Sequence, residues 1–392
     1  MCNSLNLSNE EITAGLYFHI PFCVKKCIYC DFYSITKLNK IDTFVDYLLK
    51  ELDIFHKQIG RKISIDTIFF GGGTPSLLNP NNFEKIFNKI HSIFELQNNT
   101  EITIEANPGT IDKKYLSDYR NFGINRISFG VQSFNEHELK FLNRIHSSDE
   151  AIRTIEYARY LGYPNISIDL IFGIPGQSVS SWKANLEQVK ELYINHISIY
   201  NLIFEEQTPL YNNLIKGKVK KLDEEIEEIM YIESVDFLES LGYLQYELSN
   251  FAKVGYECRH NIKYWTHRPY FGFGPSAHSY HNRLRYWNYG NLELYYKSID
   301  DNKQPIEDSE VIDNYKFIVE KIMLGLRYKG LESTFITDII TNDINQFIEQ
   351  NILPIKNCFR DISDRIILSK YGFFKLNEIA LKFINQIDLK KI

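Results

Sequence analysis

Three cysteines lie within eight residues near the N-terminus and could bind a metal centre. The segment runs Cys23-Val-Lys-Lys-Cys27-Ile-Tyr-Cys30, a C-x3-C-x2-C spacing that follows closely on Pro21. Three thiolates on one short loop suit an iron–sulfur cluster, because soft sulfur ligands select iron–sulfur, zinc or copper(I). Three protein ligands leave one iron of a four-iron cluster open to a small molecule. The alternatives are a zinc knuckle completed by His19 or a distant residue, and cysteines without a metal.

Short β-rich runs alternate with longer segments of helical period in the first half of the chain. This alternation predicts a parallel sheet with helical crossovers. The predicted strands are Leu16–Ile20, Ile65–Phe70, Ile102–Glu105, Arg126–Phe129, Ile166–Ile171 and Ile197–Tyr200. The predicted helices are Ile41–Ile59, Asn82–Phe94, Ala151–Leu161, Trp182–Leu192 and Asp223–Leu241. A loop with Gly, Pro or polar residues follows every run, and parallel α/β folds build their sites at that end of the strands.

The expected fold class is α/β, an incomplete (β/α)6 barrel of the TIM-like kind with a smaller, mainly helical C-terminal domain. Six units with a polar loop after each strand favour a barrel, although periodicity does not exclude a doubly wound sheet. We expect residues 1–250 to form the barrel and residues 251–300 an irregular connecting segment. Residues 301–392 form the helical domain, and a hairpin near its end is typical of a winged-helix arrangement.

Composition limits the class of protein and its compartment. The 392 residues are 44% hydrophobic and 24% charged, which is ordinary for a globular protein and excludes a mostly disordered or fibrous chain. A formal net charge of −6 disfavours a nucleic-acid partner, including modification of nucleic acid through the C-terminal unit. No apolar run of about 18 residues and no secretory signal are present, so we expect a cytoplasmic protein. There, a local cysteine cluster indicates a metal or redox centre rather than a disulfide framework.

The cysteine loop resembles that of the radical S-adenosylmethionine (radical SAM) superfamily, whose hallmark is the same spacing. The resemblance implies a barrel of the radical SAM type and a [4Fe–4S] cluster ligated by Cys23, Cys27 and Cys30. It also implies that SAM binds at the open iron, in a pocket built from the loops after the strands. The residues expected to line that pocket are Tyr17, Tyr29, Gly72, Gly73, Thr74, Glu105, Gln132, Arg144 and Asp169.

The chemistry of these residues agrees with a polar ligand. Glycine allows close approach of the backbone, and the carboxylate of Glu105 suits ribose hydroxyls. Gln132 can both donate and accept, and the planar fork of Arg144 suits a carboxylate. Asp169 lies in an otherwise apolar run, where a charge needs a partner or a function. For each residue alone, a structural salt bridge or simple packing is an equally good explanation.

Further segments resemble one branch of the superfamily, the oxygen-independent coproporphyrinogen III oxidases and their haem-chaperone relatives. These segments are YFHIPFCVKKCIYCDFYS, GGGTPS, RISFGVQSF, DLIFGIPGQ, HNIKYW and GFGPSAHSY. The oxidases carry a fourth cysteine two positions after the third, where this chain has Phe32. They also carry an N-terminal extension, whereas only residues 1–15 precede the first predicted strand here. Both departures favour the haem-chaperone branch.

The segment HNIKYW matches a motif that the haem chaperones carry and that is associated with haem binding. His260 is the expected haem contact, because histidine is a common axial ligand of haem iron. The rings of Tyr264 and Trp265 suit a flat porphyrin face. The alternative is that these rings belong to the core and that His260 satisfies a backbone carbonyl. Cys258 and His278 are further candidate ligands with the same alternative.

The resemblance implies a protein that binds haem and transfers it to apo-haemoproteins, with respiratory proteins at the membrane as the acceptor class. The implied cofactors are a [4Fe–4S] cluster, SAM and haem, and an electron donor is an implied partner. The alternative function is that of the enzyme, the radical oxidative decarboxylation of coproporphyrinogen III, for which no catalytic residue is assigned. The sequence leaves open whether SAM is cleaved, whether the protein sits at the membrane periphery and whether it forms a dimer.

Overall fold

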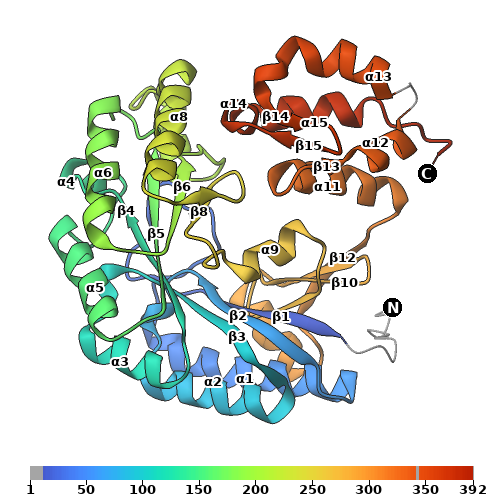
Figure 1. Ribbon diagram of the computed structural model, residues 1–392. Coiled ribbons are helices and arrows are strands. Elements are labelled where there is room, and N and C mark those ends of the chain that lie inside the picture. The colour runs from blue at the N-terminus through green and yellow to red at the C-terminus, as the bar shows by residue number, and fades with distance from the viewer. Residues whose placement is uncertain (1–11, 341–343, 392) are drawn as a thin grey trace.

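Six parallel strands form the centre of one large sheet in the computed structural model, which describes residues 12–340 and 344–391 (Figure 1). The strands are β1 (Thr13–Ile20), β2 (Ser64–Gly72), β3 (Glu95–Ala106), β4 (Arg126–Gln132), β5 (Asn165–Phe172) and β6 (His196–Asn201). Each strand pairs in parallel with the next along the chain. The six predicted strands are therefore confirmed, and all of them are longer than predicted.

The sheet continues past both edges of this parallel core. The additional strands are β7 (Leu244–Gln245), β8 (Asn250–Ala252), β9 (Tyr270–Phe273), β10 (His278–His281), β11 (Leu284–Asn288) and β12 (Ile306–Val311). Strand β9 pairs in parallel with β1, and β10 to β12 follow it antiparallel, while β8 and β7 follow β6. The order ends at β12 and β7, so hydrogen bonds between described strands do not close the barrel.

The irregular structure expected over residues 251–300 is not observed. This segment contributes β9 to β11 and the end of β8, together with helices α9 (Arg259–Trp265) and α10 (Leu292–Asp300). Its strands have only three to five residues, which is too short for their alternation to stand out in the sequence. The sheet therefore runs across the boundary at residue 250 that we expected between the barrel and the connecting segment.

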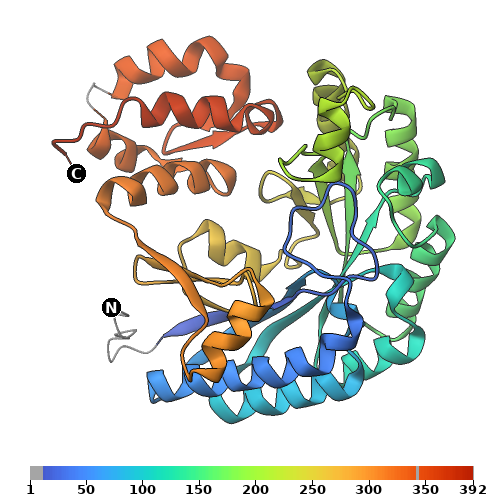
Figure 2. The same cartoon turned by 180° about the vertical axis from the view of Figure 1, so that it is seen from behind.

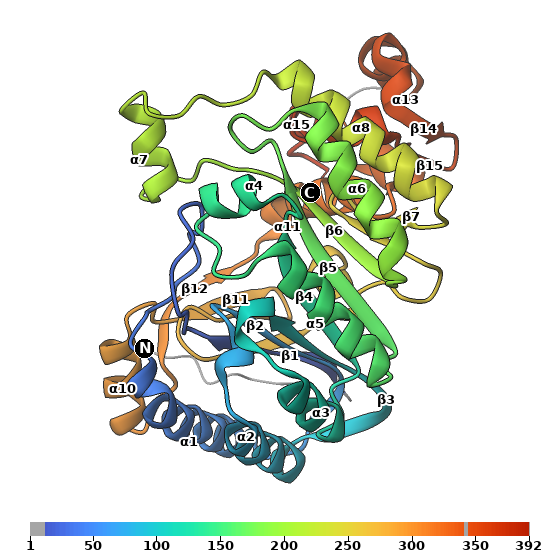
Figure 3. The same cartoon turned by 90° about the vertical axis from the view of Figure 1, so that its left-hand side faces the viewer.

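Helices cover the convex face of the sheet in an outer layer (Figures 1 and 3). In contact order they are α10, α1 (Ile41–Ile59), α2 (Pro80–Ile93), α3 (Lys113–Asn121), α5 (Ser148–Tyr160), α6 (Val179–Leu192) and α8 (Glu224–Ser240). Several begin where the sequence provides a cap. The side chains of Asn79, Ser147 and Ser178 each accept a hydrogen bond from a backbone N–H of the first turn of α2, α5 and α6.

The two faces of the sheet differ in chemistry because successive side chains of a strand point to opposite sides. On the outer face, Phe18 of β1 is fully buried and its ring stacks on that of Phe70 of β2 at 4.9 Å. On the inner face, Tyr17 of β1 lies next to Phe69 of β2, with ring centroids 6.2 Å apart. The helices thus cover an apolar face of the sheet, and the polar side chains of the strands can lie on the inner face.

The C-terminal region is mainly helical with a small sheet, as expected. Helix α11 (Asn314–Arg327) packs against α15 (Leu376–Ile384), and β14 (Phe359–Ile362) forms an antiparallel hairpin with β15 (Arg365–Leu368). The remaining elements are β13 (Leu331–Glu332), α12 (Ser333–Ile339), α13 (Ile344–Phe347) and α14 (Lys370–Phe374). No described helix is long and apolar enough to cross a membrane.

Candidate cofactor site

The three cysteines lie on the loop that follows the C-terminal end of β1, seen as a dark blue loop in Figure 2. Two backbone hydrogen bonds close the base of this loop. Cys23 N–H donates to the carbonyl of Ile35 at 2.9 Å, and Ile35 N–H donates to the carbonyl of Pro21 at 2.7 Å. The cysteine loop therefore leaves the sheet and returns to it at one place, which limits how far its thiols can move.

Two short helices flank the cysteine loop, α4 (Glu136–Phe141) and α7 (Pro209–Ile215) (Figure 3). The Asn143 side-chain amide, just after α4, donates to the carbonyl of Lys26 at 2.9 Å. The backbone N–H of Leu210 in α7 donates to the carbonyl of Ile28 at 2.9 Å. Both contacts are made by the loop backbone, and the side chains of Ile28 and Tyr29 add packing against a small apolar cluster that includes Leu142.

Two of the thiols contact polar groups from neighbouring loops. Thr74 Oγ1 donates to Cys23 Sγ at 3.6 Å, and Arg144 Nη1 donates to Cys27 Sγ at 3.3 Å. A cation beside a thiol favours the thiolate, which is the form that binds metals. Burial raises the pKa of Cys30 to about 11, so without a metal this third thiol keeps its proton. Metal binding at the loop must therefore release protons.

The donor set fits an iron–sulfur cluster better than a zinc knuckle. All three cysteines are free, but no three His, Cys, Asp or Glu side chains of the described residues converge as a single ion requires. A four-iron cluster attaches its cysteines to different irons, so its ligands surround it and share no common point. His19 is a poor fourth zinc ligand, because its Nε2 is 2.9 Å from the carbonyl of Tyr33 and its Nδ1 is 3.2 Å from the hydroxyl of Tyr17.

The glycines at the end of β2 are required by close packing against the end of β1 and the start of the cysteine loop. Gly72 has φ +106°, and an added Cβ would lie 2.7 Å from the imidazole ring of His19. At Gly73 an added Cβ would lie 2.7 Å from the carbonyl oxygen of Phe22. Glycine alone combines this backbone conformation with this approach. The close approach that the structure shows is to His19 and Phe22 of the protein itself, and contact of these glycines with a ligand stays a prediction.

Two acidic residues of the predicted pocket stand on neighbouring parts of the inner face. Glu105 at the end of β3 accepts a hydrogen bond from Gly72 N–H at 3.2 Å. Burial, together with the nearby Asp169, raises the pKa of Glu105 to about 8, against the opposing effects of the Gly72 hydrogen bond and Arg126. Burial also raises the pKa of Asp169, although hydrogen bonds from Ser198 and Ser128 oppose this. A neutral Glu105 carboxyl can donate as well as accept a hydrogen bond at neutral pH.

Gln132, Arg144 and Tyr29 form a second group beside the cysteines. Gln132 lies at the end of β4 with φ +69°, and a Cβ added to Gly130 would lie 2.8 Å from its amide nitrogen and 3.3 Å from Arg144 Nη2. Burial raises the pKa of Tyr29, and the groups that act on it include Arg144 and Cys27. The buried Nε of Arg144 has no hydrogen-bond partner among the described residues. The guanidinium is thus able to bind a further acceptor.

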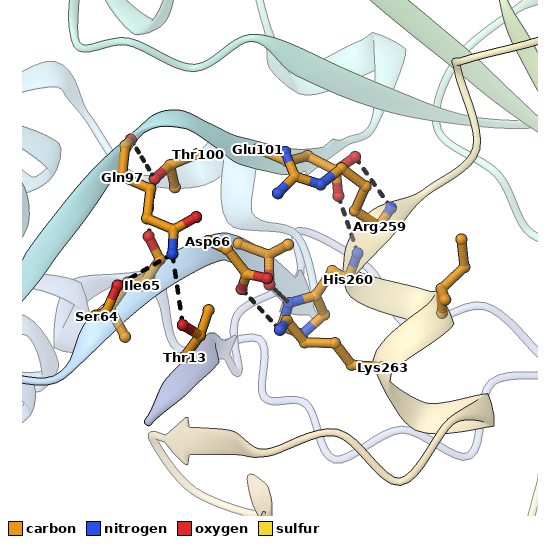
Figure 4. A network of polar contacts seen from close by, with 12 residues as sticks. Thr13, Ser64, Ile65, Asp66, Gln97, Thr100, Glu101, Arg259, His260 and Lys263 are labelled. Carbon is orange, nitrogen blue, oxygen red and sulfur yellow. Dashed lines mark hydrogen bonds and ion pairs between the residues drawn. The ribbon is translucent and has the colours of Figure 1, made fainter. Parts of the chain in front are cut away.

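The HNIKYW segment forms α9 on the inner side of the sheet, near the N-terminal ends of β2 and β3 (Figure 4). Glu101 of β3 caps this helix from outside it, because its carboxylate accepts the backbone N–H groups of Arg259 at 3.1 Å and His260 at 3.0 Å. Lys263 Nζ forms an ion pair with Asp66 Oδ1 of β2 at 2.7 Å. The cysteines follow the opposite end of β1, so the two predicted sites lie at different ends of the strands.

His260 is fully buried, and both of its ring nitrogens have partners. Nδ1 is 2.9 Å from Thr67 Oγ1, and Nε2 is 3.0 Å from the Tyr264 hydroxyl. Burial, together with the nearby Lys263 and Arg126, lowers the pKa of His260 to about 3. The haem contact predicted at His260 would therefore require two hydrogen bonds to break. The observed partners are side chains, not the backbone carbonyl of the alternative interpretation.

The other two candidate haem ligands lie in contrasting places. Cys258 is fully buried beside Glu101, with Sγ 3.8 Å from Oε1, and burial raises the pKa of its thiol to about 12. His278 is exposed, and its ring stacks on Trp287 at 5.5 Å. Asp66, Thr67 and Glu101 are partners of α9 that were not predicted from the sequence. Their signal was polar residues inside the apolar runs of β2 and β3.

Comparisons with known proteins agree with this arrangement. The sequence model of the Radical SAM superfamily matches residues 17–189. The heme chaperone HemW of Lactococcus lactis is 34% identical over 378 residues, which covers 94% of this chain and 96% of the relative. HemW of Escherichia coli is 41% identical over 268 residues, covering 67% of this chain and 69% of the relative.

A solved structure shows the same fold over nearly the whole chain. The coproporphyrinogen III oxidase HemN of Escherichia coli, described as a radical SAM enzyme, superposes with a TM-score of 0.81. Its sequence is 23% identical, and the match covers 95% of this chain and 90% of HemN. The sheet and its outer layer of helices thus belong to a known fold. The chain is a member of the radical SAM superfamily and, within it, of the HemW family.

Proposed function

We propose that this protein is a haem chaperone, which binds haem and hands it to apo-haemoproteins. The observation that carries the proposal is the similarity to HemW over nearly the full length of both chains. Three of the HemW relatives, from different bacteria, are described as heme chaperones. We propose respiratory haemoproteins as the acceptors, reached from the cytoplasmic side of the membrane.

We assign a [4Fe–4S] cluster to Cys23, Cys27 and Cys30, as membership of the superfamily implies. When bound, the reduced cluster supplies the electron for homolytic cleavage of SAM, and a separate electron donor must reduce it. We assign SAM to the inner-face pocket lined by Tyr17, Tyr29, Gly72, Gly73, Thr74, Glu105, Gln132, Arg144 and Asp169.

The residues of this pocket have distinct tasks in the proposal. Arg144 offsets the negative charge of the Cys27 thiolate, and its unpaired Nε is available to a ligand carboxylate. Glu105 is held by Gly72 N–H and carries a proton at neutral pH, so it can donate to a ligand hydroxyl without adding charge. Tyr29 lies between the second and third cysteines in the sequence and packs against the apolar cluster that includes Leu142.

A second candidate is the radical oxidative decarboxylation of coproporphyrinogen III. The HemN-like fold permits it, but the similarity at 23% identity concerns the fold alone. The residue two positions after Cys30 is Phe32, whose side chain is 62% exposed. No thiol is therefore available at the position where the oxidases carry their fourth cysteine.

A haem titration followed by a transfer assay tests the proposal. The cluster is reconstituted without oxygen, haem is added, and saturation near one haem per chain is expected in the absorbance spectrum. The loaded protein is then mixed with an apo-cytochrome of the b type. Direct transfer predicts a rate that rises with acceptor concentration, whereas release into solution gives a rate independent of it.

The same sample separates the two candidate functions. Coproporphyrinogen III, SAM and a reductant are added, and the products are examined by mass spectrometry. Loss of propionate carboxyl groups would establish the oxidase activity and make it the preferred function over the chaperone. The absence of saturable haem binding would remove the main support of the chaperone proposal.

A further inference from the structure

A cavity of about 340 Å³ lies where α9, the antiparallel strands and α11 meet, and Figure 1 shows α9 beneath α11. Its wall includes the rings of Trp265, Tyr270 and Tyr280 and the side chain of Met323. A second cavity of about 230 Å³ is bounded by α11 and α15. Both cavities share Trp265, Met323 and Leu324 in their walls, so a few side chains separate them.

The wall suits a flat apolar ring system with carboxylate groups. Aromatic faces pack well on planar rings, and a methionine side chain is flexible enough to adapt to them. Arg285 lines the first cavity and Arg327 the second, and a haem carboxylate there would share these guanidinium groups with their present partners, Glu320 and Glu247. A ligand that spans both cavities would have to displace side chains of the wall that they share, and their combined volume falls in the range of known ligand pockets.

The wall of the first cavity also includes an imidazole that is held by a carboxylate. Nε2 of His267 is 3.1 Å from Glu320 Oε2, and Arg285 binds the same carboxylate through two contacts of 2.9 Å. Histidines that bind metals usually donate their other ring N–H to a carboxylate, which fixes the ring. Nδ1 is then the nitrogen available to a metal. Burial lowers the pKa of His267, although Glu320 opposes this, so the ring is neutral at pH 7.

Two further features point to a ligand here. The buried indole Nε1 of Trp265 has no hydrogen-bond partner among the described residues. Buried polar atoms nearly always have a partner, so a ligand acceptor would satisfy this group. His267 has φ +50°, a conformation that non-glycine residues seldom adopt. Such strain concentrates at ligand sites, where the surroundings hold it in place.

We propose that these two cavities are the haem site, with His267 Nδ1 as the axial ligand and Trp265, Tyr270 and Tyr280 against the porphyrin. The proposal rests on the haem chaperone function proposed above. It gives the HNIKYW segment two roles. His260 holds α9 in the barrel through Thr67 and Tyr264, and Trp265 at the end of the same helix contacts the haem.

The test compares histidine variants of the whole, cluster-loaded protein in a titration with haem. His267→Asn is suitable because asparagine tolerates positive φ and can still hydrogen bond to Glu320, but it is a poor ligand of haem iron. His91→Asn is the matched control, since His91 is an exposed residue in the last turn of α2 and lines neither cavity. We expect His267→Asn to bind haem about tenfold or more weakly and to shift the Soret band, and the control to do neither.

A second variant tests the cavity and leaves the proposed axial ligand, His267, unchanged. Met323 lines both cavities and is 43% exposed, so Met323→Trp should fold and fill the space, and we expect it to weaken haem binding. Unchanged affinity and spectrum in both His267→Asn and Met323→Trp, with normal binding by the wild type, would overturn this site while leaving the chaperone function intact. Failure of the wild type to bind haem would overturn both. A Soret shift in His260→Asn but not in His267→Asn would assign the ligand to His260 instead.

Discussion

Removal of the Lys263 ammonium should strongly destabilise the protein. Lys263 Nζ lies 2.7 Å from Asp66 Oδ1, and their side chains are only 2% and 12% exposed. In Lys263→Met the apolar stem is retained, but Asp66 is left as a buried charge without its partner. Breaking a buried ion pair from one side costs about 3–5 kcal/mol. Because Asp66 keeps some exposure, we expect about 3 kcal/mol, near the lower end of that range.

Two further variants make the measurement specific. In Asp66→Asn/Lys263→Met both charges are absent, and neutral replacement of a buried pair is often close to neutral in free energy, so most of the stability should return. Lys89→Met is the matched control, since Lys89 pairs with Asp53 at a similar 2.8 Å but the side chains are 26% and 47% exposed. Exposed pairs contribute about 0–1 kcal/mol, and the control should lose no more than that.

Urea unfolding followed by circular dichroism at pH 7 gives the free energy of unfolding of the wild type and of each of the three variants. The loss in Lys263→Met should also depend on pH. An unpaired buried carboxylate has a raised pKa in the folded state, so the loss is complete above that value and shrinks as the pH falls toward about 3.9, the unfolded value. The reasoning is refuted if Lys263→Met loses no more stability than Lys89→Met, or if the double variant regains none of the stability that Lys263→Met loses.

Three shorter predictions concern other parts of the molecule. Cys27→Ser should lose the visible absorbance of the reconstituted cluster, whereas Cys358→Ser, a buried free cysteine of the C-terminal region, should keep it. Gly72→Ala should lower the free energy of unfolding in urea by more than Gly60→Ala does. Both glycines have positive φ, and this strain alone costs about 1–2 kcal/mol, but only Gly72 lacks room for a Cβ. Burial raises the pKa of Glu51 to about 7, so stability should fall as the pH rises from about 4.3 through 7, and Glu51→Gln should flatten that slope.

The parallel strands and the cysteine loop could be predicted because their signals are local. Each strand from β1 to β6 buries its outer face under a helix, which gives a run of apolar residues followed by a polar loop. The spacing of Cys23, Cys27 and Cys30 is likewise contained in eight residues. Glycines such as Gly72 stood out by composition, although the reason for them, the ring of His19, is a contact across strands.

The edge strands and the surroundings of α9 could not be predicted because they depend on distant pairings. β9 joins the sheet beside β1, about 255 residues earlier in the chain, through the register Tyr17↔Gly272. The partners of His260 come from β2 and from its own helix, and nothing near Thr67 in the sequence indicates this contact. An isolated histidine in an aromatic segment therefore has the same local signal whether it is a ligand or a buried structural residue.

The inside of the barrel is filled between its two ends, and this separates the proposed haem site from the SAM pocket. The Tyr17 ring lies 6.4 Å from that of His260 and 6.2 Å from that of Phe69, and its hydroxyl is 3.2 Å from His19. These side chains form a packed layer between α9 and the cysteine loop, and such layers leave little room for a ligand to pass. A haem held beneath α11 would therefore lie outside the reach of chemistry at the cluster. This arrangement favours holding and releasing haem over radical chemistry on a porphyrin in the same cavity.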